Sequence, residues 1–335
     1  MNDYSPFPSE ESKADLTPSP DLTREHIQVS SIALAITFIT LATIVLQIVF
    51  TRLFSLLSPS LSAKPWYTMI TSMMPMYLFA MPLSLLLYRI GKPSPPAKRN
   101  ISLAAWLALL SITFAVTYIG NFIGIGVNAI ISLLTGKPVE NQLQTLTQQT
   151  PFWANLLFVG ILAPILEEIF YRKLVIDRLR RYGDLVAILV SGVLFGLLHG
   201  NFSQLFYACL GGFLFGYVYL YTGKLRYTIA LHMTVNLVGG VFISEITKRI
   251  DLAALESGSV EALLQNLVPL SLFGGYLTLV LSCLILGPIS IILLRRHIRF
   301  AQGEIRLSPK TFFRIFLFNP SVWILLILLI LGFIA

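Results

Sequence analysis

The segment PILEEIFYR, residues 164–172, carries two adjacent carboxylates and an arginine within a long apolar run. Each charged side chain at the centre of a membrane helix costs about 2.5–3.5 kcal/mol on insertion scales, so this group calls for a specific role. In a helix, Glu168 and Arg172 are four residues apart on one face and can form an ion pair. Glu167 is rotated by about 100° from Glu168 and cannot share that arginine so directly. We therefore expect a structural carboxylate at Glu168 and one free for chemistry at Glu167.

The composition of the whole chain is that of a membrane protein. Of its 335 residues 56% are hydrophobic and only 12% are charged, whereas a soluble domain is about one quarter charged. Apolar runs of about 20 residues, the length that crosses a bilayer, recur along the chain. The sequence therefore predicts an all-α, polytopic helical membrane protein with about eight or nine transmembrane helices.

The division of the chain follows from these runs. Residues 1–30 are rich in Ser, Pro, Asp and Glu and predict a disordered cytoplasmic tail, and we expect no cleavable signal peptide there. Residues 31–335 form the predicted membrane domain. Its nine apolar segments are residues 31–57, 66–90, 102–135, 151–176, 184–200, 203–222, 225–247, 264–294 and 318–335.

Basic residues predict the orientation of these segments. Most of the 24 Lys and Arg follow the second, fourth, sixth and eighth segments, the first of these groups beginning at Arg89. The positive-inside rule then puts these connections and the N-terminus in the cytoplasm and the C-terminus outside. The formal charge of +8 is explained by this topology. We therefore expect the protein to be partnered by the lipid bilayer and not by nucleic acid.

Two later apolar segments add further polar residues. His199 ends the fifth segment, and His232 and Asn236 lie four residues apart, hence on one face, in the seventh. If the fourth and fifth segments form an antiparallel hairpin around residues 182–183, Glu167 and His199 reach nearly the same depth. Carboxylate, imidazole and amide groups together can activate water or hold a metal. We therefore expect one polar chamber between three neighbouring spans.

Each of these residues taken singly also has a structural interpretation. A lone membrane histidine is more often a hydrogen-bond partner between helices than a ligand, and Glu168 with Arg172 can be a purely structural pair. The two cysteines, Cys209 and Cys283, lie in apolar helices and are expected to be packing residues, which leaves no disulfide framework. The functional interpretation therefore depends on the residues acting together.

The three motifs together resemble those of the CPBP family, the CAAX proteases and bacteriocin-processing enzymes also called the Abi family. The family pattern is Glu-Glu-x-x-x-Arg, Phe-x-x-x-His and His-x-x-x-Asn on successive membrane helices. This chain matches in order, with Glu167-Glu168-x-x-x-Arg172, Phe195-x-x-x-His199 and His232-x-x-x-Asn236. It departs from the pattern at Lys173, where family members often have Gly. The resemblance places a catalytic core at about residues 151–247.

The resemblance implies an intramembrane endopeptidase that cleaves a peptide or protein substrate at the membrane. Glu167 would activate the water, His199 would hold it, and Glu168 and Arg172 would orient the site. His232 and Asn236 would bind the water or stabilise the oxyanion. Both a zinc-dependent and a metal-free glutamate mechanism have been argued for the family. No His-Glu-x-x-His helix is present, but Glu167, His199 and His232 could bind Zn²⁺ with one open position.

Two other functions remain open from the sequence. A non-catalytic membrane regulator or scaffold would need the polar residues only for packing. A proton-coupled transporter could use buried Glu and His as a proton relay, but usually has an internal repeat, and none is found. The resemblance points to the cell membrane, in particular a bacterial inner membrane.

Overall fold

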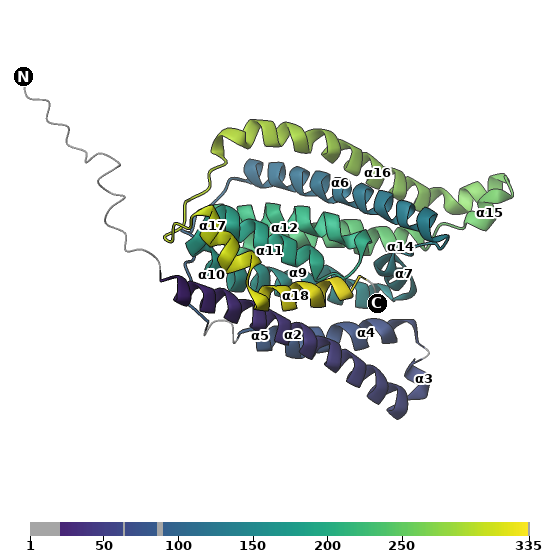
Figure 1. Ribbon diagram of the computed structural model, residues 1–335. Coiled ribbons are helices and arrows are strands. Elements are labelled where there is room, and N and C mark those ends of the chain that lie inside the picture. Colours follow the sequence, from purple (N-terminus) through teal and green to yellow (C-terminus); the bar gives the residue numbers. More distant parts are fainter. Residues whose placement is uncertain (1–20, 63, 86–89, 334–335) are drawn as a thin grey trace, which may run out of the picture.

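The computed structural model describes residues 21–62, 64–85 and 90–333, and its long helices lie roughly alongside one another (Figure 1). Among these residues there is no β-strand. All nine predicted apolar segments coincide with helices over their described residues. The prediction of an all-α, polytopic membrane protein is therefore confirmed.

The number of spans depends on how short helices are counted. In the described part of the chain, six helices are long and apolar enough to cross a membrane, and a seventh span results if the pair Pro309–Leu317 and Pro320–Leu331, bent by 58°, is counted as one. The predicted eight or nine spans are reached only if two shorter apolar helices, Met69–Ser84 and Asp184–Leu197, are counted as well. The helix Asp184–Leu197 has 14 residues and is therefore only about 21 Å long. The hydrocarbon core of a bilayer is roughly 30 Å thick.

The first helix, α2 (Leu22–Leu57), begins earlier than predicted. Asp21 caps it by accepting hydrogen bonds from the backbone N–H groups of Thr23 and Arg24. The predicted tail was therefore wrong for residues 22–30, which are helical, while residues 1–20 lie outside the described part. The cause is tertiary, because the buried carboxylate of Glu25 pairs with Arg181 at 3.0 Å and accepts a hydrogen bond from the Tyr182 hydroxyl at 2.6 Å.

The next helices complete a hairpin beside α2 and then an outer layer. The hairpin consists of α3 (Pro59–Ser62), α4 (Pro65–Pro75), the π-helical turn Met76–Ala80 and α5 (Met81–Ser84); Arg89 lies outside the described residues. The outer layer of Figure 1 contains α6 (Leu103–Thr135) and α16 (Val260–Leu294). α6 starts at its cap Ser102 and ends at Gly136, whose φ is 68°.

Glycines allow the inner helices to pack closely. α6 contacts α12 (Phe202–Thr222), where a Cβ on Gly120 would lie 2.4 Å from the Tyr207 Cα atom. α12 in turn contacts α11 (Asp184–Leu197), where a Cβ on Gly212 would lie 2.8 Å from the Gly192 Cα atom. Small residues at such crossings let helix backbones approach in a membrane.

Three inner helical spans carry the three motifs. Phe152–Tyr182 is one continuous span, with π-helical stretches at Asn155–Leu162 and Ile169–Ile176 on either side of α9 (Ala163–Glu168). α11 follows after Gly183, and α13 (Leu225–Asn236) continues through a π-helical stretch, Leu237–Phe242, into α14 (Ile243–Thr247). Such π-helical turns often occur at functional sites.

The basic connections meet at one end of the molecule, where α10 (Asp177–Leu179) and α17 (Pro309–Phe312) lie in Figure 1. Backbone hydrogen bonds join the connections in pairs: Ser94 N to Asp177 O at 2.7 Å, Arg99 N to Thr222 O at 2.7 Å, and Asp184 N to Ala301 O at 3.0 Å. The opposite end carries α7 (Gln142–Gln149) and α15 (Leu252–Glu256). The described basic connections thus lie at one end of the molecule, and the prediction that this end faces the cytoplasm stays a prediction.

Candidate active site

The ion pair predicted from helical spacing is present and fully buried. Glu168 and Arg172 both have 0% exposed side chains. The guanidinium donates to both carboxylate oxygens, from Nε to Oε2 at 2.9 Å and from Nη2 to Oε1 at 3.3 Å. Its Nη1 donates to the Ser191 hydroxyl of α11 at 3.0 Å. Both charges are therefore compensated, which is what a buried ion pair needs to be tolerated.

His232 links the two adjacent glutamates. Its Nδ1 lies 3.2 Å from Glu168 Oε1, and its Nε2 lies 3.8 Å from Glu167 Oε2. Because the carboxylate of Glu168 is held by an arginine and can only accept, Nδ1 carries the proton of this hydrogen bond. A neutral His232 therefore presents the lone pair of Nε2 toward Glu167. The imidazole is held between Phe215, stacked at 5.2 Å between ring centroids, and Phe195, edge-on at 5.6 Å.

Glu167 is the carboxylate left without a lysine or arginine partner. It forms no ion pair with lysine or arginine among the residues that the structure describes, and its side chain is 12% exposed. It lines a cavity of about 580 Å³ together with His199, His232 and Asn236. The convergence of three spans on one chamber, expected from the sequence, is therefore present.

His199 lines the same cavity, but the structure gives it no hydrogen bond or ion pair with Glu167. It follows the last turn of α11, where its Nδ1 lies 2.7 Å from the Phe195 carbonyl oxygen. Because a carbonyl only accepts, Nδ1 carries the proton and Nε2 is the atom left for a ligand. Gly200, with φ of 65°, turns the chain directly afterwards, and Asn201 caps α12. The imidazole thus sits at a helix end inside the protein.

Asn236 is anchored to the backbone of the first motif helix. Its Nδ2 donates to the carbonyl oxygen of Val159 at 3.0 Å. An amide nitrogen has two hydrogens, so one remains for another acceptor. Val159 lies in the π-helical stretch Asn155–Leu162, and the contact fixes the level of α13 relative to the span of Glu167.

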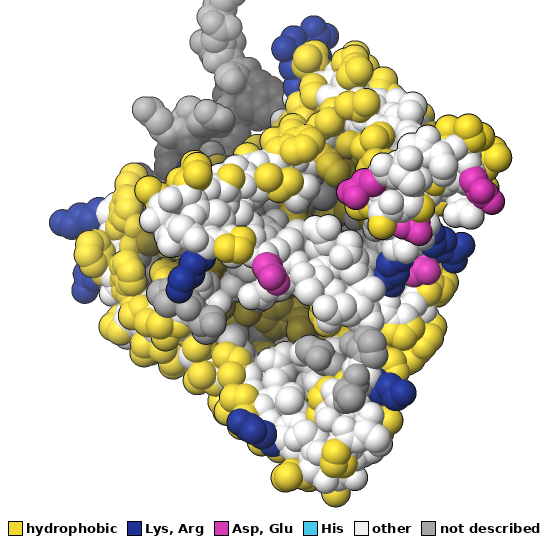
Figure 2. Space-filling model, turned by 90° about the vertical axis from the view of Figure 1, so that its right-hand side faces the viewer, with side chains coloured by type: hydrophobic (Ala, Val, Ile, Leu, Met, Phe, Trp, Pro, Cys, Tyr) yellow, Lys and Arg dark blue, Asp and Glu magenta, His cyan; other side chains and the backbone are white. Residues whose placement is uncertain are grey.

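The cavity continues from these residues to the end of the molecule where α7 lies. Figure 2 views that end and shows a hollow near the centre of the face, with mostly uncharged side chains around it. The described lining toward α7 carries no charge and includes polar side chains beside apolar ones such as Leu143; the polar ones are Gln47, Asn121, Asn141, Gln144, Thr147, Gln148 and Thr247. Amide and hydroxyl groups of this kind can hydrogen-bond the backbone of an extended peptide.

The predicted metal ligands are not assembled as a metal site. Among the described residues no three His, Cys, Asp or Glu side chains are placed so that they could hold a metal ion. Glu167 and His232 face each other, whereas the Nδ1 atom of His199 is held by its own helix. The side chains as placed therefore do not fit a three-ligand Zn²⁺ site, and bound zinc stays a prediction.

Two site residues were missed in the sequence. Ser191 accepts a hydrogen bond from Arg172. Phe215 stacks on His232, and the centre of its ring lies 5.9 Å from the Arg172 guanidinium carbon. The sequence could have identified Ser191, because Ser191, Phe195 and His199 follow one another at four-residue spacing and so lie on one face of a helix. No such pattern points to Phe215, because only the packing of α12 brings it to the site.

These contacts define a polytopic membrane protein in which one carboxylate and two imidazoles line a single cavity. Residues 149–238 match the protein family described as "Type II CAAX prenyl endopeptidase Rce1-like". The part of the chain that carries all three motifs is therefore similar to the CPBP family of membrane proteases, as the motifs indicated.

Two curated proteins are each similar to part of the chain. The chain is 32% identical over 82 residues to "Putative membrane peptidase YdiL" of Bacillus subtilis, which covers 24% of this chain and 34% of that protein. It is 28% identical over 107 residues to "Membrane-embedded CAAX protease MroQ" of Staphylococcus aureus, covering 30% and 42% respectively. The matched part thus spans well under half of either relative. No solved structure gives a significant match.

Proposed function

We propose that this protein is an intramembrane endopeptidase that hydrolyses a peptide bond of a membrane-associated substrate. The observation that carries the proposal is that two adjacent glutamates have different surroundings. Glu168 is paired with Arg172, while Glu167 faces the cavity and the Nε2 atom of His232. The family match of residues 149–238 and the names of the two relatives support the same class of reaction.

In the proposed reaction a water molecule binds between Glu167 and an imidazole Nε2 atom, from His232 or His199. Glu167 accepts a proton as the water oxygen attacks the scissile carbonyl carbon. The free N–H of Asn236 donates to the oxyanion that develops. Glu167 then returns the proton to the leaving amine nitrogen as the carbon–nitrogen bond breaks. Glu168 and Arg172 act as positioning residues because they orient His232.

We also propose how the protein is oriented in the membrane and from which side its substrate reaches the cavity. The basic connections face the cytoplasm of a cell membrane, as the excess of Lys and Arg favours. The N-terminal end of α2 is on that side because Glu25 pairs with Arg181. The cavity runs toward the opposite, α7 end. A substrate segment would therefore reach Glu167 from the non-cytoplasmic side.

The decisive experiment reconstitutes the purified protein in vesicles with a panel of membrane-inserted peptides carrying a fluorophore and a quencher. We expect Glu167→Gln to lower cleavage by at least about 10²-fold, the usual contribution of a general base. Glu256→Gln is the matched control, because it removes the same charge from an exposed position on α15. Equal cleavage by both variants would exclude the proposed base. A cellular phenotype that persists in Glu167→Gln would favour a non-catalytic regulator.

A further inference from the structure

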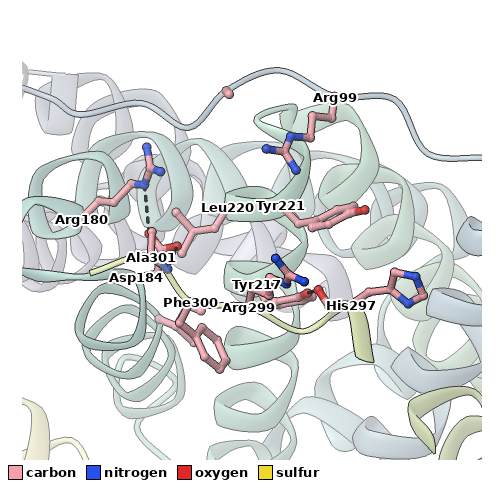
Figure 3. Close-up of a pocket in the computed structure, with 12 residues that line it drawn as sticks. Arg99, Arg180, Asp184, Tyr217, Leu220, Tyr221, His297, Arg299, Phe300 and Ala301 are labelled. Carbon is pink, nitrogen blue, oxygen red and sulfur yellow. Dashed lines mark hydrogen bonds and ion pairs between the residues drawn. The ribbon is translucent and has the colours of Figure 1, made fainter. Parts of the chain in front are cut away.

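A second cavity lies at the basic end of the molecule, apart from the proposed active site. It measures about 450 Å³, and its lining comes from the connection before α6, the start of α11, the end of α12 and the chain that follows α16 (Figure 3). The polar lining residues are Arg99, Arg180, Asp184, Tyr217, Tyr221, His297 and Arg299. None of these residues has a part in the hydrolysis proposed above.

The cavity has an excess of positive charge. Its one carboxylate, Asp184, is already paired with Arg180 Nε at 3.0 Å and accepts the backbone N–H of Ala301 at 2.8 Å. Arg180 also donates through Nη1 to the Pro95 carbonyl oxygen at 3.1 Å. These two residues therefore compensate each other.

Arg99 and Arg299 supply the excess. In Figure 3 their side chains enter the cavity from opposite sides, and the Arg99 guanidinium carbon lies 5.9 Å from the centre of the Tyr221 ring. Neither side chain forms an ion pair within the part of the chain that the structure describes. Two guanidinium groups facing one space form a suitable receptor for a phosphate anion, which they can bind through paired N–H donors.

The surroundings of the cavity place it at the boundary between headgroups and acyl chains. Asp184 lines the cavity, and the next residue begins an exposed apolar row on α11, Leu185, Leu189 and Val193, at four-residue spacing. Phe300 at the cavity rim is 48% exposed and packs edge-on against Tyr217. Aromatic side chains gather at the level of lipid headgroups. An acyl chain can therefore lie along this row while its headgroup occupies the cavity.

We propose that this cavity binds the phosphate of an anionic phospholipid headgroup, held by Arg99 and Arg299. The chemistry is shared with free inorganic phosphate, but the adjoining apolar row of α11 favours a lipid. Arg180 lies in the last turn of the span of Glu167, and Asp184 begins the helix that leads to His199. A lipid bound here would therefore contact the ends of two helices that build the proposed active site.

The test is a titration of purified, detergent-solubilised full-length protein, with binding followed by native mass spectrometry and by the shift in thermal unfolding. The ligands are phosphatidylglycerol, phosphatidylcholine and inorganic phosphate. The double variant Arg99→Gln/Arg299→Gln is compared with Lys98→Gln/Arg296→Gln, which removes the same charge from exposed residues of the same two connections outside the cavity lining.

We expect phosphatidylglycerol to bind the wild type and the control variant more tightly than phosphatidylcholine does. Each lost arginine should weaken that binding about fivefold, or about 25-fold for the pair. Equal weakening in the control variant would overturn the proposed site, because it would show a general charge effect. Inorganic phosphate that stabilises the protein at the same concentrations as phosphatidylglycerol would overturn the assignment to lipid. The single variant Arg299→Gln repeats the test with a smaller perturbation.

Discussion

The Nδ1 atom of His232 lies 3.2 Å from the Oε1 atom of Glu168, although 64 positions separate the two residues in the chain. Since Glu168 is also held by the buried Arg172, this contact fixes the imidazole and turns its Nε2 atom toward Glu167. A structural carboxylate therefore orients the ring that faces its neighbour. The two glutamates should respond differently to substitution, and this difference can be measured.

Glu168→Gln should destabilise the protein far more than Glu167→Gln. Loss of the Glu168 charge leaves Arg172 buried without an anion, which typically costs about 3–5 kcal/mol. Glu167 has no such partner, so its substitution should change the free energy of unfolding by less than about 1 kcal/mol. Denaturant unfolding in detergent micelles measures both values. Equal destabilisation would contradict the separate roles of the two residues.

Ser191→Ala should destabilise the protein through Arg172. The Ser191 hydroxyl accepts from Arg172 Nη1 at 3.0 Å and donates to the Tyr171 carbonyl oxygen at 3.1 Å. Without it, a buried charged donor loses its acceptor, at a cost of about 1–3 kcal/mol. The same unfolding measurement applies, with the exposed Ser257→Ala as control. A loss no larger than that of the control would show that Arg172 finds another acceptor.

His199→Gln and His232→Gln should separate activity from stability. His199 bonds only within its own helix end, so its substitution should lower cleavage by about 10²-fold or more while leaving stability nearly unchanged. His232 also donates to buried Glu168, and its substitution should lower cleavage and cost about 1–3 kcal/mol of stability. Cleavage and unfolding are measured on the same preparations. Wild-type cleavage by His199→Gln would remove that residue from the proposed mechanism.

Gly120→Ala should disturb the crossing of α6 and α12. Its Cβ would lie 2.4 Å from the Tyr207 Cα atom, and backbone cannot move aside as a side chain can. We expect a loss of about 1–3 kcal/mol from overpacking. Gly126→Ala on the same helix is the matched control, since its Cβ would meet nothing within 4 Å. A thermal unfolding scan that ranks the two variants equally would refute the close crossing.

The proposed orientation predicts which cysteines react from outside the cell. In a chain with Cys209 and Cys283 replaced by alanine, Ser257→Cys beside α15 should react with a membrane-impermeant maleimide on intact cells. Gln302→Cys, at the basic end, should react only after permeabilisation. Both positions are exposed in the structure. The reverse pattern would invert the proposed topology and place the mouth of the cavity in the cytoplasm.

The sequence by itself determined the class of fold and the local pairing. Its apolar runs were enough to predict helices, because a backbone in lipid must satisfy its own hydrogen bonds. The spacing of four residues was enough to pair Glu168 with Arg172 and to leave Glu167 without that arginine, because the rise and rotation of a helix are fixed. That pairing is confirmed at 2.9 Å.

Tertiary structure decided everything that depends on how helices are rotated and shifted against one another. Only packing shows that His232 contacts both glutamates and that Asn236 is tied to Val159. Packing against Arg181 and Tyr182 likewise makes residues 22–30 helical, although their composition predicted disorder. Such contacts join residues far apart in the chain, so no local pattern in the sequence encodes them.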